Sequence, residues 1–371
     1  MSGRLAKARR IVIKIGSALL VDSGSGQLRR KWLGGLAQDI AALKADGKEV
    51  LIVSSGAIAL GRRTIGRTGP RLKLEEKQAA AAIGQIKLAH AYEEALAAHD
   101  INVAQALLTL GDTEERRRYL NARSTFMTLL RFGVVPVINE NDTVATSEIR
   151  YGDNDRLAAR VAQMVSADCL VLLSDVEGLF ESDPTVDPDA RIVPEIHVID
   201  AAVMAMAGVA RSDAGTGGMV TKLKAAEIAI DNGCNMLIAQ GNRERPLRAI
   251  IEGARCSWFL AHKSPRAARK QWIASALKPA GAIVIDDGAV TALASGKSLL
   301  PAGVVSVSGD FQRGDPVAVL TLQGRELGRG LSAYSRDDAA RIAGHKSREI
   351  ETLLGYSGRT ELIHRDDLAL V

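Results

Sequence analysis

A lysine interrupts the first apolar run of the chain. Lys14 stands in the middle of IVIKIG (residues 11–16), and Gly16 and Ser17 follow it closely. Because an unpaired ammonium group is costly to bury, this side chain must either point to water, as on an edge strand, or meet an anion. A lysine near the end of a buried strand and next to a tight turn is suited to a phosphate oxygen. Lys14 is therefore our first candidate site residue.

A glycine-rich segment late in the chain carries a second lysine. GTGGMVTKLKAAEIAI (residues 215–230) matches neither the P-loop pattern GxxxxGK[ST] nor the dinucleotide pattern GxGxxG. Its glycines and the N-terminus of the helix behind them can still present backbone N–H groups to an anion, with Lys222 as a movable positive charge. The alternative is an ordinary glycine-rich loop with a surface lysine. A phosphoryl group between Lys14 and Lys222 would be stabilised from two sides, and phosphoryl transfer needs mainly that, in-line positioning and a metal ion.

Polar side chains also follow three predicted strands, at the point where each strand ends. These residues are Ser54 to Gly56, Asn139 to Asp142, and Ser174 with Asp175. In an open parallel sheet, ligands bind outside the carboxyl ends of the strands, so these groups are expected on one rim. Each of them alone is explained as simply by a helix cap or a turn. Several on one edge favour a binding site.

The segment YGDNDRLAARVAQ (residues 151–163) opens a helix with Asp153, Asn154 and Asp155. Negative side chains in a first turn complement the helix dipole, and capping alone can explain them. Three polar residues in succession exceed what one cap needs, so they can also bind a substrate ammonium group or hold lysines in position. The residues alone leave both interpretations open.

Short apolar, β-branched runs alternate with Ala/Leu-rich helical patterns up to about residue 260. The runs cover residues 11–16, 49–56, 102–110, 134–142, 169–175 and 234–241. Continuous apolar strands separated by helices are typical of a parallel sheet covered on both faces. We therefore predict an α/β fold with a three-layer, open and mostly parallel sheet, in a first domain over residues 1–260.

The pattern changes in the last part of the chain. Residues 278–371 hold short alternating runs broken by Asp-Gly and Gly-Asp turns, which is typical of a small β-barrel domain. The stretch before it is polar and basic with prolines near its ends, and we predict a linker over residues 261–277.

Composition and charge exclude several classes of protein. The 371 residues are 47% hydrophobic and 25% charged, and the net charge of +5 is mild and interspersed. The N-terminal apolar run contains Lys14 and lacks a small-residue cleavage site, and no other apolar stretch approaches about 18 residues, so we expect neither a signal peptide nor a membrane span. The three cysteines are scattered without a Cys-x-x-Cys pair, so we expect no disulfide framework and no zinc site, and a cytoplasmic location fits best.

Other catalytic classes lack their motifs. The chain has no GxSxG elbow, so Ser54 and Ser55 are poor candidates for a nucleophile. Its six histidines form no HExxH pattern or ligand cluster, and we expect no metal site made by protein side chains. The missing dinucleotide pattern argues against a dehydrogenase.

A set of motifs, in this order, resembles those of the amino acid kinase family, and within it the glutamate 5-kinases (gamma-glutamyl kinases). The motifs are KIGSALL, VSSGAIALG, YLNAR, VPVINENDTVATSEI, GDNDRLAA, LLSDVEGLF and GTGGMVTKLKAA. The INEND and GTGGM-x-TK segments distinguish the chain from acetylglutamate, aspartate and uridylate kinases. The stretch from SLLPAGVV to GRGLSAY resembles the C-terminal PUA domain of these enzymes. Small departures remove no charged catalytic group: Ser54 and Ser174 stand in place of threonine, Arg150 in place of lysine, and Val220 in place of serine.

The resemblance implies ATP-dependent phosphorylation of the side-chain carboxylate of L-glutamate, the first step of proline biosynthesis. The catalytic residues would be Lys14, Lys222 and Asp155, with Asp155 holding the two lysines in place. The ATP site would comprise Lys14, Ser174, Asp175, Thr216, Gly217, Gly218, Met219, Val220, Thr221 and Lys222. The glutamate site would comprise Ser55, Asp142 and Asn154.

The resemblance also implies cofactors and partners. ATP would bring Mg²⁺, held largely by phosphate oxygens and water. A glutamate side chain with a pKa of about 4.3 is already ionised at neutral pH, so no general base is needed. Family members are inhibited by proline and form dimers or tetramers, and the labile acyl phosphate product suggests handover to glutamyl phosphate reductase. Two alternatives stay open: an RNA-binding or RNA-modifying protein that uses the PUA domain, and an amino acid kinase for another acid.

Overall fold

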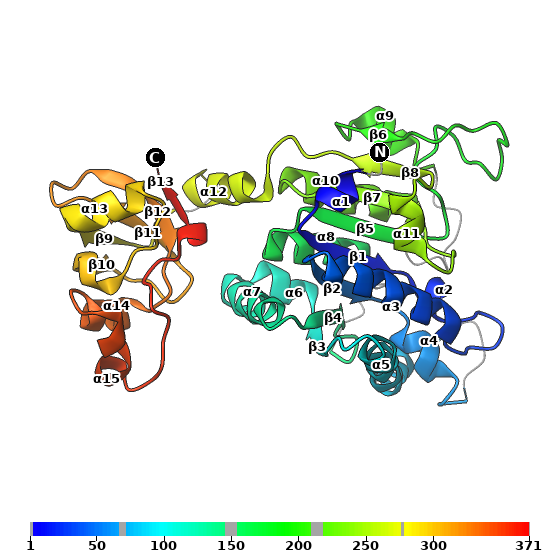
Figure 1. Cartoon of the computed structure of the whole chain (residues 1–371), viewed down its shortest axis with the longest axis horizontal. Helices are drawn as coiled ribbons and strands as arrows, with labels where there is room; N and C mark the ends of the chain where they lie inside the picture. The colour runs from blue at the N-terminus through cyan, green and yellow to red at the C-terminus, as the bar shows by residue number, and fades with distance from the viewer. Residues whose placement is uncertain (1–2, 67–71, 145–153, 209–217, 276–277, 371) are drawn as a thin grey trace. The chain divides into compact units, whose positions relative to one another are not determined.

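The computed structural model describes residues 3–66, 72–144, 154–208, 218–275 and 278–370 (Figure 1). Contacts divide the chain into two compact units, Met1–Pro265 and Arg266–Val371. Within the described ranges, no helix has the length and apolar character needed to cross a membrane.

An eight-stranded sheet forms the centre of the first unit, in the order β3-β4-β2-β1-β5-β7-β8-β6. Neighbouring strands pair in parallel except β7 and β8, which are antiparallel. Strand β1 has β2 on one side and β5 on the other, so the chain order reverses there, and ligands of such folds bind at the carboxyl ends of these strands. The strand bounds are β1 (Arg10–Ile15), β2 (Glu49–Ser54), β3 (Val103–Leu108), β4 (Val135–Glu140), β5 (Cys169–Ser174), β6 (Glu195–Ile196), β7 (Asn235–Gln240) and β8 (Cys256–Phe259).

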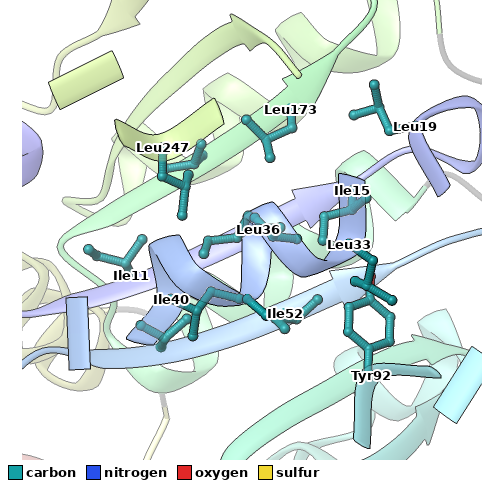
Figure 2. Close-up of a cluster of buried hydrophobic side chains, with 14 of the residues drawn as sticks. Ile11, Ile15, Leu19, Leu33, Leu36, Ile40, Ile52, Tyr92, Leu173 and Leu247 are labelled. Carbon is teal, nitrogen blue, oxygen red and sulfur yellow. The ribbon is translucent and has the colours of Figure 1, made fainter. Parts of the chain in front are cut away.

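The two faces of this sheet bury two separate hydrophobic cores. Ile11, Ile13 and Ile15 of β1 belong to one core and Val12 to the other, because successive side chains of a strand point to opposite faces. Figure 2 shows the first core, where Leu36 and Ile40 of a covering helix lie over the sheet. Helices thus cover both faces, which confirms the predicted three-layer, mostly parallel α/β fold.

The helices divide between these faces. The first core receives side chains from α1 (Gly3–Lys7), α2 (Ser17–Leu20), α3 (Arg30–Ala45), α4 (Ala57–Arg62), α5 (Leu74–Ala97) and α11 (Pro246–Ile251). The second receives them from α7 (Arg116–Arg131), α8 (Asn154–Val165), α9 (Ala201–Ala205) and α10 (Met219–Asp231), and the short α6 (Leu110–Glu114) precedes α7.

Helices α4 and α5 approach each other closely because both present a glycine at the crossing. A Cβ atom added at Gly61 would lie 1.8 Å from the carbonyl oxygen of Ala80, and one added at Gly84 would lie 1.7 Å from that of Ala57. No larger residue fits at either position without moving a backbone. The crossing therefore fixes α5 against the helix that starts at the end of β2.

The second unit has its own sheet and its own core. The sheet has the strand order β10-β9-β11-β12-β13, and its pairs are antiparallel except β9 with β11. The bounds are β9 (Gly281–Ile285), β10 (Val304–Gly309), β11 (Pro316–Leu320), β12 (Glu326–Leu331) and β13 (Leu368–Leu370), with helices α13 (Asp287–Ala294), α14 (Arg336–Ile342) and α15 (Ile350–Leu354) and the 3₁₀ turns η1 (Pro301–Gly303), η2 (Ser347–Glu349) and η3 (Arg365–Asp367). This small, separate and mainly antiparallel sheet confirms the predicted second part of the fold class.

The segment predicted as a linker contains a helix, α12 (Pro265–Ser275). Arg269 of this helix forms a buried ion pair with Asp367, at 2.6 Å between Nη2 and Oδ1. Since both side chains are less than a tenth exposed, the pair ties α12 to the C-terminal end of the second unit.

Candidate active site

One buried carboxylate joins the two lysines that stand out in the sequence. Lys14 Nζ lies 2.5 Å from Asp155 Oδ1, and Lys222 Nζ lies 3.3 Å from Asp155 Oδ2. The three side chains are 11%, 8% and 1% exposed for Lys14, Lys222 and Asp155. Residues 208 positions apart in the sequence thus meet at one carboxylate, and we call Lys14, Asp155 and Lys222 the lysine cluster.

Strand β1 and helices α8 and α10 position the lysine cluster. Lys14 follows Val12 by two residues, so it lies on the face of β1 that α8 and α10 cover. Asp155 is in the first turn of α8, and Lys222 is the fourth residue of α10. The apolar residues of the second core fix both helices against the sheet and so bring the three groups together.

The lysines decide the ionisation of Asp155. Burial raises the pKa of this carboxyl, but the charges of Lys14 and then Lys222 outweigh burial and hold its pKa below the ordinary value. The group is therefore ionised at neutral pH. Two ammonium groups share this one carboxylate, so two positive charges lie side by side at the rim of the sheet, where they can attract an anion.

The N-terminus of α10 lies beside the lysine cluster. Gly218 is the residue before its first turn, and the Thr221 hydroxyl donates to the Gly218 carbonyl at 2.8 Å and to Asp155 Oδ2 at 3.2 Å. The first N–H groups of a helix lack partners inside the helix and suit an anion. Met219 and Val220 supply two of these groups. Thr216 and Gly217, also predicted for the ATP site, lie outside the described residues.

A chain of polar side chains lies next to the lysine cluster, and we call it the amide chain: Ser55, Asn154, Asn139 and Gln85. Asn154 Nδ2 donates to Ser55 Oγ at 2.6 Å and to Asn139 Oδ1 at 3.3 Å. Asn139 Nδ2 in turn donates to Gln85 Oε1 at 2.8 Å. The three amide residues are each less than a tenth exposed, and the Oδ1 atom of Asn154 is buried without a hydrogen-bond partner within the described part of the chain.

The turn after β2 holds Ser55 in place. Its backbone N–H donates to the carbonyl of Ile15 at the end of β1. Gly56 has a φ of 108°, a conformation that strongly favours glycine, and it starts helix α4. Ser54 is fully buried, and its hydroxyl shares a 2.9 Å hydrogen bond with the hydroxyl of Tyr92 on α5.

Asp142 comes two residues after the end of β4, at the same rim. Burial raises the pKa of its carboxyl from the ordinary 3.8 to about 6. Within the described ranges, this carboxylate has no ion-pair partner. It is therefore a partly buried carboxylate that is ionised at pH 7, and a ligand cation would stabilise it.

Ser174 and Asp175 follow β5, the other neighbour of β1. Ser174 is buried, and its hydroxyl donates to Asp175 Oδ1 at 2.9 Å, whereas the Asp175 side chain is exposed. They lie at the carboxyl edge of the sheet as predicted, but no hydrogen bond joins them to the lysine cluster within the described residues. Their assignment to the nucleotide stays a prediction.

Two residues of this site were missing from the sequence prediction, Gln85 and Tyr92. Both lie on α5, whose sequence LEEKQAAAAIGQIKLAHAYEEALA is rich in alanine. From the sequence, neither of the two glutamines in this helix can be distinguished from a solvent-exposed one. The pair of glycines at positions 61 and 84 was the one available signal for a close helix contact, and Gln85 follows directly after it.

The described residues contain no group of three or more His, Cys, Asp or Glu side chains that could hold a metal ion. Both oxygens of the Asp155 carboxylate face lysines. A divalent cation at this rim would therefore need most of its ligands from a bound phosphate and from water.

Comparison with known sequences identifies a family for each of the two parts of the chain. Residues 9–240 match the amino acid kinase family, and residues 281–354 match the PUA domain. The chain is 63% identical to the glutamate 5-kinase of Paramagnetospirillum magneticum over 366 residues, which covers 99% of both chains. It is 61% identical to the glutamate 5-kinase of Rhodospirillum rubrum, over 97% of this chain and 96% of that one. Among solved structures, carbamate kinase from Giardia lamblia is 18% identical with a TM-score of 0.48, over 70% of this chain and 100% of that one.

Proposed function

The chain belongs to the glutamate 5-kinase branch of the amino acid kinase family, and from this premise we propose which residues of the rim perform the reaction. The reaction transfers the γ-phosphoryl group of ATP to the side-chain carboxylate of L-glutamate and gives L-glutamyl 5-phosphate, in the first step of proline biosynthesis. The chain is thus a phosphotransferase with a carboxyl group as acceptor.

The lysine cluster is the single observation that carries the assignment of roles. Lys14 and Lys222 would contact oxygens of the transferred phosphoryl group, where negative charge must be stabilised as the bond to ADP breaks. Asp155 would keep both ammonium groups in place without taking a proton. Because the attacking carboxylate is already ionised at neutral pH, the reaction needs no general base.

The amide chain and Asp142 would bind the amino acid end of glutamate. The partly buried carboxylate of Asp142 and the unpartnered Oδ1 of Asn154 are both acceptors, and they suit the α-ammonium group. Ser55 would offer its hydroxyl beside Asn154. This arrangement would hold the side-chain carboxylate of glutamate toward the lysine cluster.

ATP would bind between the N-terminus of α10 and the end of β5. The residues that we assign to it are those predicted from the sequence: Lys14, Ser174, Asp175, Thr216, Gly217, Gly218, Met219, Val220, Thr221 and Lys222. Mg²⁺ would enter with the phosphates, and its chemistry when bound is to neutralise part of their charge.

Further expectations from the sequence remain proposals. These are inhibition by proline, assembly into dimers or tetramers, handover of the labile product to glutamyl phosphate reductase, and a cytoplasmic location. The three cysteines are buried free thiols, which fits a reducing compartment. The alternatives of an RNA-modifying protein or a kinase for another acid are not favoured, since relatives at 57–63% identity are glutamate 5-kinases.

A substrate panel tests the proposed function. The full chain is incubated with ATP, Mg²⁺ and one acceptor, either glutamate, N-acetylglutamate, aspartate or UMP, and ADP release is followed. We expect kcat/KM for glutamate to exceed that of each other acceptor by about 100-fold or more, and hydroxylamine to trap the product as a hydroxamate. Turnover should disappear without Mg²⁺. A preference for any other acceptor would overturn the assignment.

A further inference from the structure

The amide chain reaches farther from the rim than substrate binding alone requires. Gln85 belongs to α5, and its side chain meets Asn139 at the end of β4 behind the substrate residues. Asn139 then meets Asn154, the residue to which the proposed function assigns the ammonium group of the substrate. A buried glutamine two links away from the ligand needs a reason beyond packing, because an apolar side chain of similar size would fill the same space without a polar group to satisfy.

The hydrogen bonds of the amide chain run in one direction, because each side-chain amide has one end that donates and one end that accepts. Gln85 offers its oxygen to Asn139, so Asn139 must turn its nitrogen toward Gln85 and its oxygen toward Asn154. Asn154 must then turn its nitrogen inward, where the backbone carbonyl of Ser54 at 3.3 Å and the Ser55 hydroxyl also accept. The oxygen of Asn154 is the end that remains, and it is the buried atom without a partner.

Losing the first link would remove one of the contacts that hold this direction. Without an acceptor at position 85, the nitrogen of Asn139 would lose its partner, and the oxygen of Asn139 would be held less firmly against Asn154. Asn154 would be held by the Ser54 carbonyl and the Ser55 hydroxyl alone. These two acceptors still keep the nitrogen of Asn154 turned inward, but its unpartnered oxygen would be positioned less precisely.

We propose that Gln85 is a positioning residue for recognition of the α-ammonium group of glutamate. Acting through Asn139, it keeps Oδ1 of Asn154 directed at the ammonium group, which is a charged donor and the best partner for a buried carbonyl oxygen. This inference rests on the proposed function of the same site.

The contact between α4 and α5 makes the position of Gln85 rigid. Gly84, its neighbour, packs against the backbone of Ala57, and Ala57 opens the helix that follows Ser55 and Gly56. The first and last members of the amide chain are therefore held by one helix crossing. A shift of α5 would move Gln85 and the Ser55 turn together.

The test compares glutamate with glutarate, which keeps both carboxylates and lacks the ammonium group. In Gln85→Met, which has similar size and no acceptor, we expect the KM for glutamate to rise by about 10-fold with kcat nearly unchanged. The inhibition constant of glutarate, competing with glutamate, should change by less than about twofold, because glutarate has no group for Asn154 Oδ1. In Gln85→Glu, which retains an acceptor for Asn139, the KM for glutamate should return to within about threefold of the original chain.

A neighbouring residue provides the control. Ile86 is 74% exposed on the same helix, so Ile86→Ala should change neither the KM for glutamate nor the inhibition constant of glutarate. Equal weakening of glutamate and glutarate in Gln85→Met would mean a general disturbance of α5 and would overturn the inference. So would an unchanged KM for glutamate, or failure of Gln85→Glu to restore it. If the original chain does not phosphorylate glutamate at all, the proposed function fails instead, and the two failures are distinguishable.

Discussion

Asn154 and Asp155 are adjacent in the first turn of α8, yet they belong to two polar clusters of different character. Asp155 joins two ammonium groups through charge, at 2.5 and 3.3 Å. Asn154 joins hydroxyl and amide groups that are all neutral. Most of the residues in both clusters are buried, so both clusters depend on mutual satisfaction of their polar atoms.

The difference suggests that the two clusters have separate functions, one in catalysis and one in substrate recognition. Charge acts over distance and suits a phosphoryl group whose charge shifts during the reaction. Neutral amides have a direction, so they distinguish a donor from an acceptor at one position, which is what recognition of an ammonium group needs. We therefore expect kcat to depend mainly on the lysine cluster, and the KM for glutamate mainly on the amide chain with Asp142.

Removing the central charge of the lysine cluster should have the largest effect. In Asp155→Asn, the lysines lose their common anion, and we expect kcat to fall by about 100-fold or more while the KM for glutamate stays within about threefold. The free energy of unfolding should fall by about 3 kcal/mol, because two buried ammonium groups lose their counter-charge. Steady-state kinetics and urea unfolding measure both. Asp231→Asn, an exposed change on α10, is the control and should alter neither.

The same cluster predicts a dependence of stability on pH. The folded pKa of Asp155 lies below its ordinary value of 3.8, so its contribution to stability is present above about pH 4 and is lost as the pH falls through the folded pKa. Asp155→Asn should lack this part of the acid destabilisation. If the original protein and Asp155→Asn lost the same stability below pH 4, the assigned pairing of Asp155 with the two lysines would be contradicted.

Changing Asp142, which we group with the amide chain in binding glutamate, should have the next largest effect on the kinetics. Its pKa of about 6 implies that kcat/KM for glutamate falls as the pH drops below 6, because the protonated carboxyl no longer pairs with the ammonium group. In Asp142→Asn, we expect the KM for glutamate to rise by about 10-fold or more and this acid limb to disappear. A pH profile of kcat/KM measures both, and an unchanged acid limb in the variant would exclude Asp142 as its source.

Asp142 should also show that binding and stability conflict at this position. Its folded pKa is above the ordinary value of 3.8, so the folded state binds the proton more tightly, and stability falls as the pH rises from about 4 to 6. At pH 7, Asp142→Asn removes a charge that burial disfavours and should raise the unfolding temperature of the ligand-free chain. A lower unfolding temperature would mean that a partner already compensates this charge.

Tyr92→Phe should have the smallest effect. It removes one buried hydrogen bond to Ser54 and keeps the ring, so we expect a loss of about 1 kcal/mol in the free energy of unfolding. The KM for glutamate should change by less than about twofold, because the Ser54 hydroxyl retains the carbonyl of Ser55. A large rise in KM would extend the amide chain to Tyr92.

Much of the sheet and of the lysine cluster could be predicted from local rules. A lysine inside an apolar strand is costly without an anion, so Lys14 stood out, and strand ends of a parallel sheet share one rim. Gln85 could not be predicted, because its role depends on a glycine contact between two helices and on residues 54 and 69 positions away. The helix in the predicted linker was missed for a similar reason, since Arg269 has its partner 98 residues later.

The measurement that most directly tests the division between the two clusters is the kinetics of Lys222→Ala beside Lys224→Ala. Lys224 lies two residues later on α10 and is exposed, so it reports the loss of a lysine from that helix without the buried contact. We predict that Lys222→Ala lowers kcat by about 1000-fold with little change in the KM for glutamate, whereas Lys224→Ala stays within about twofold. Near-normal turnover in Lys222→Ala, or an equal loss in both variants, would contradict the assigned role of the lysine cluster.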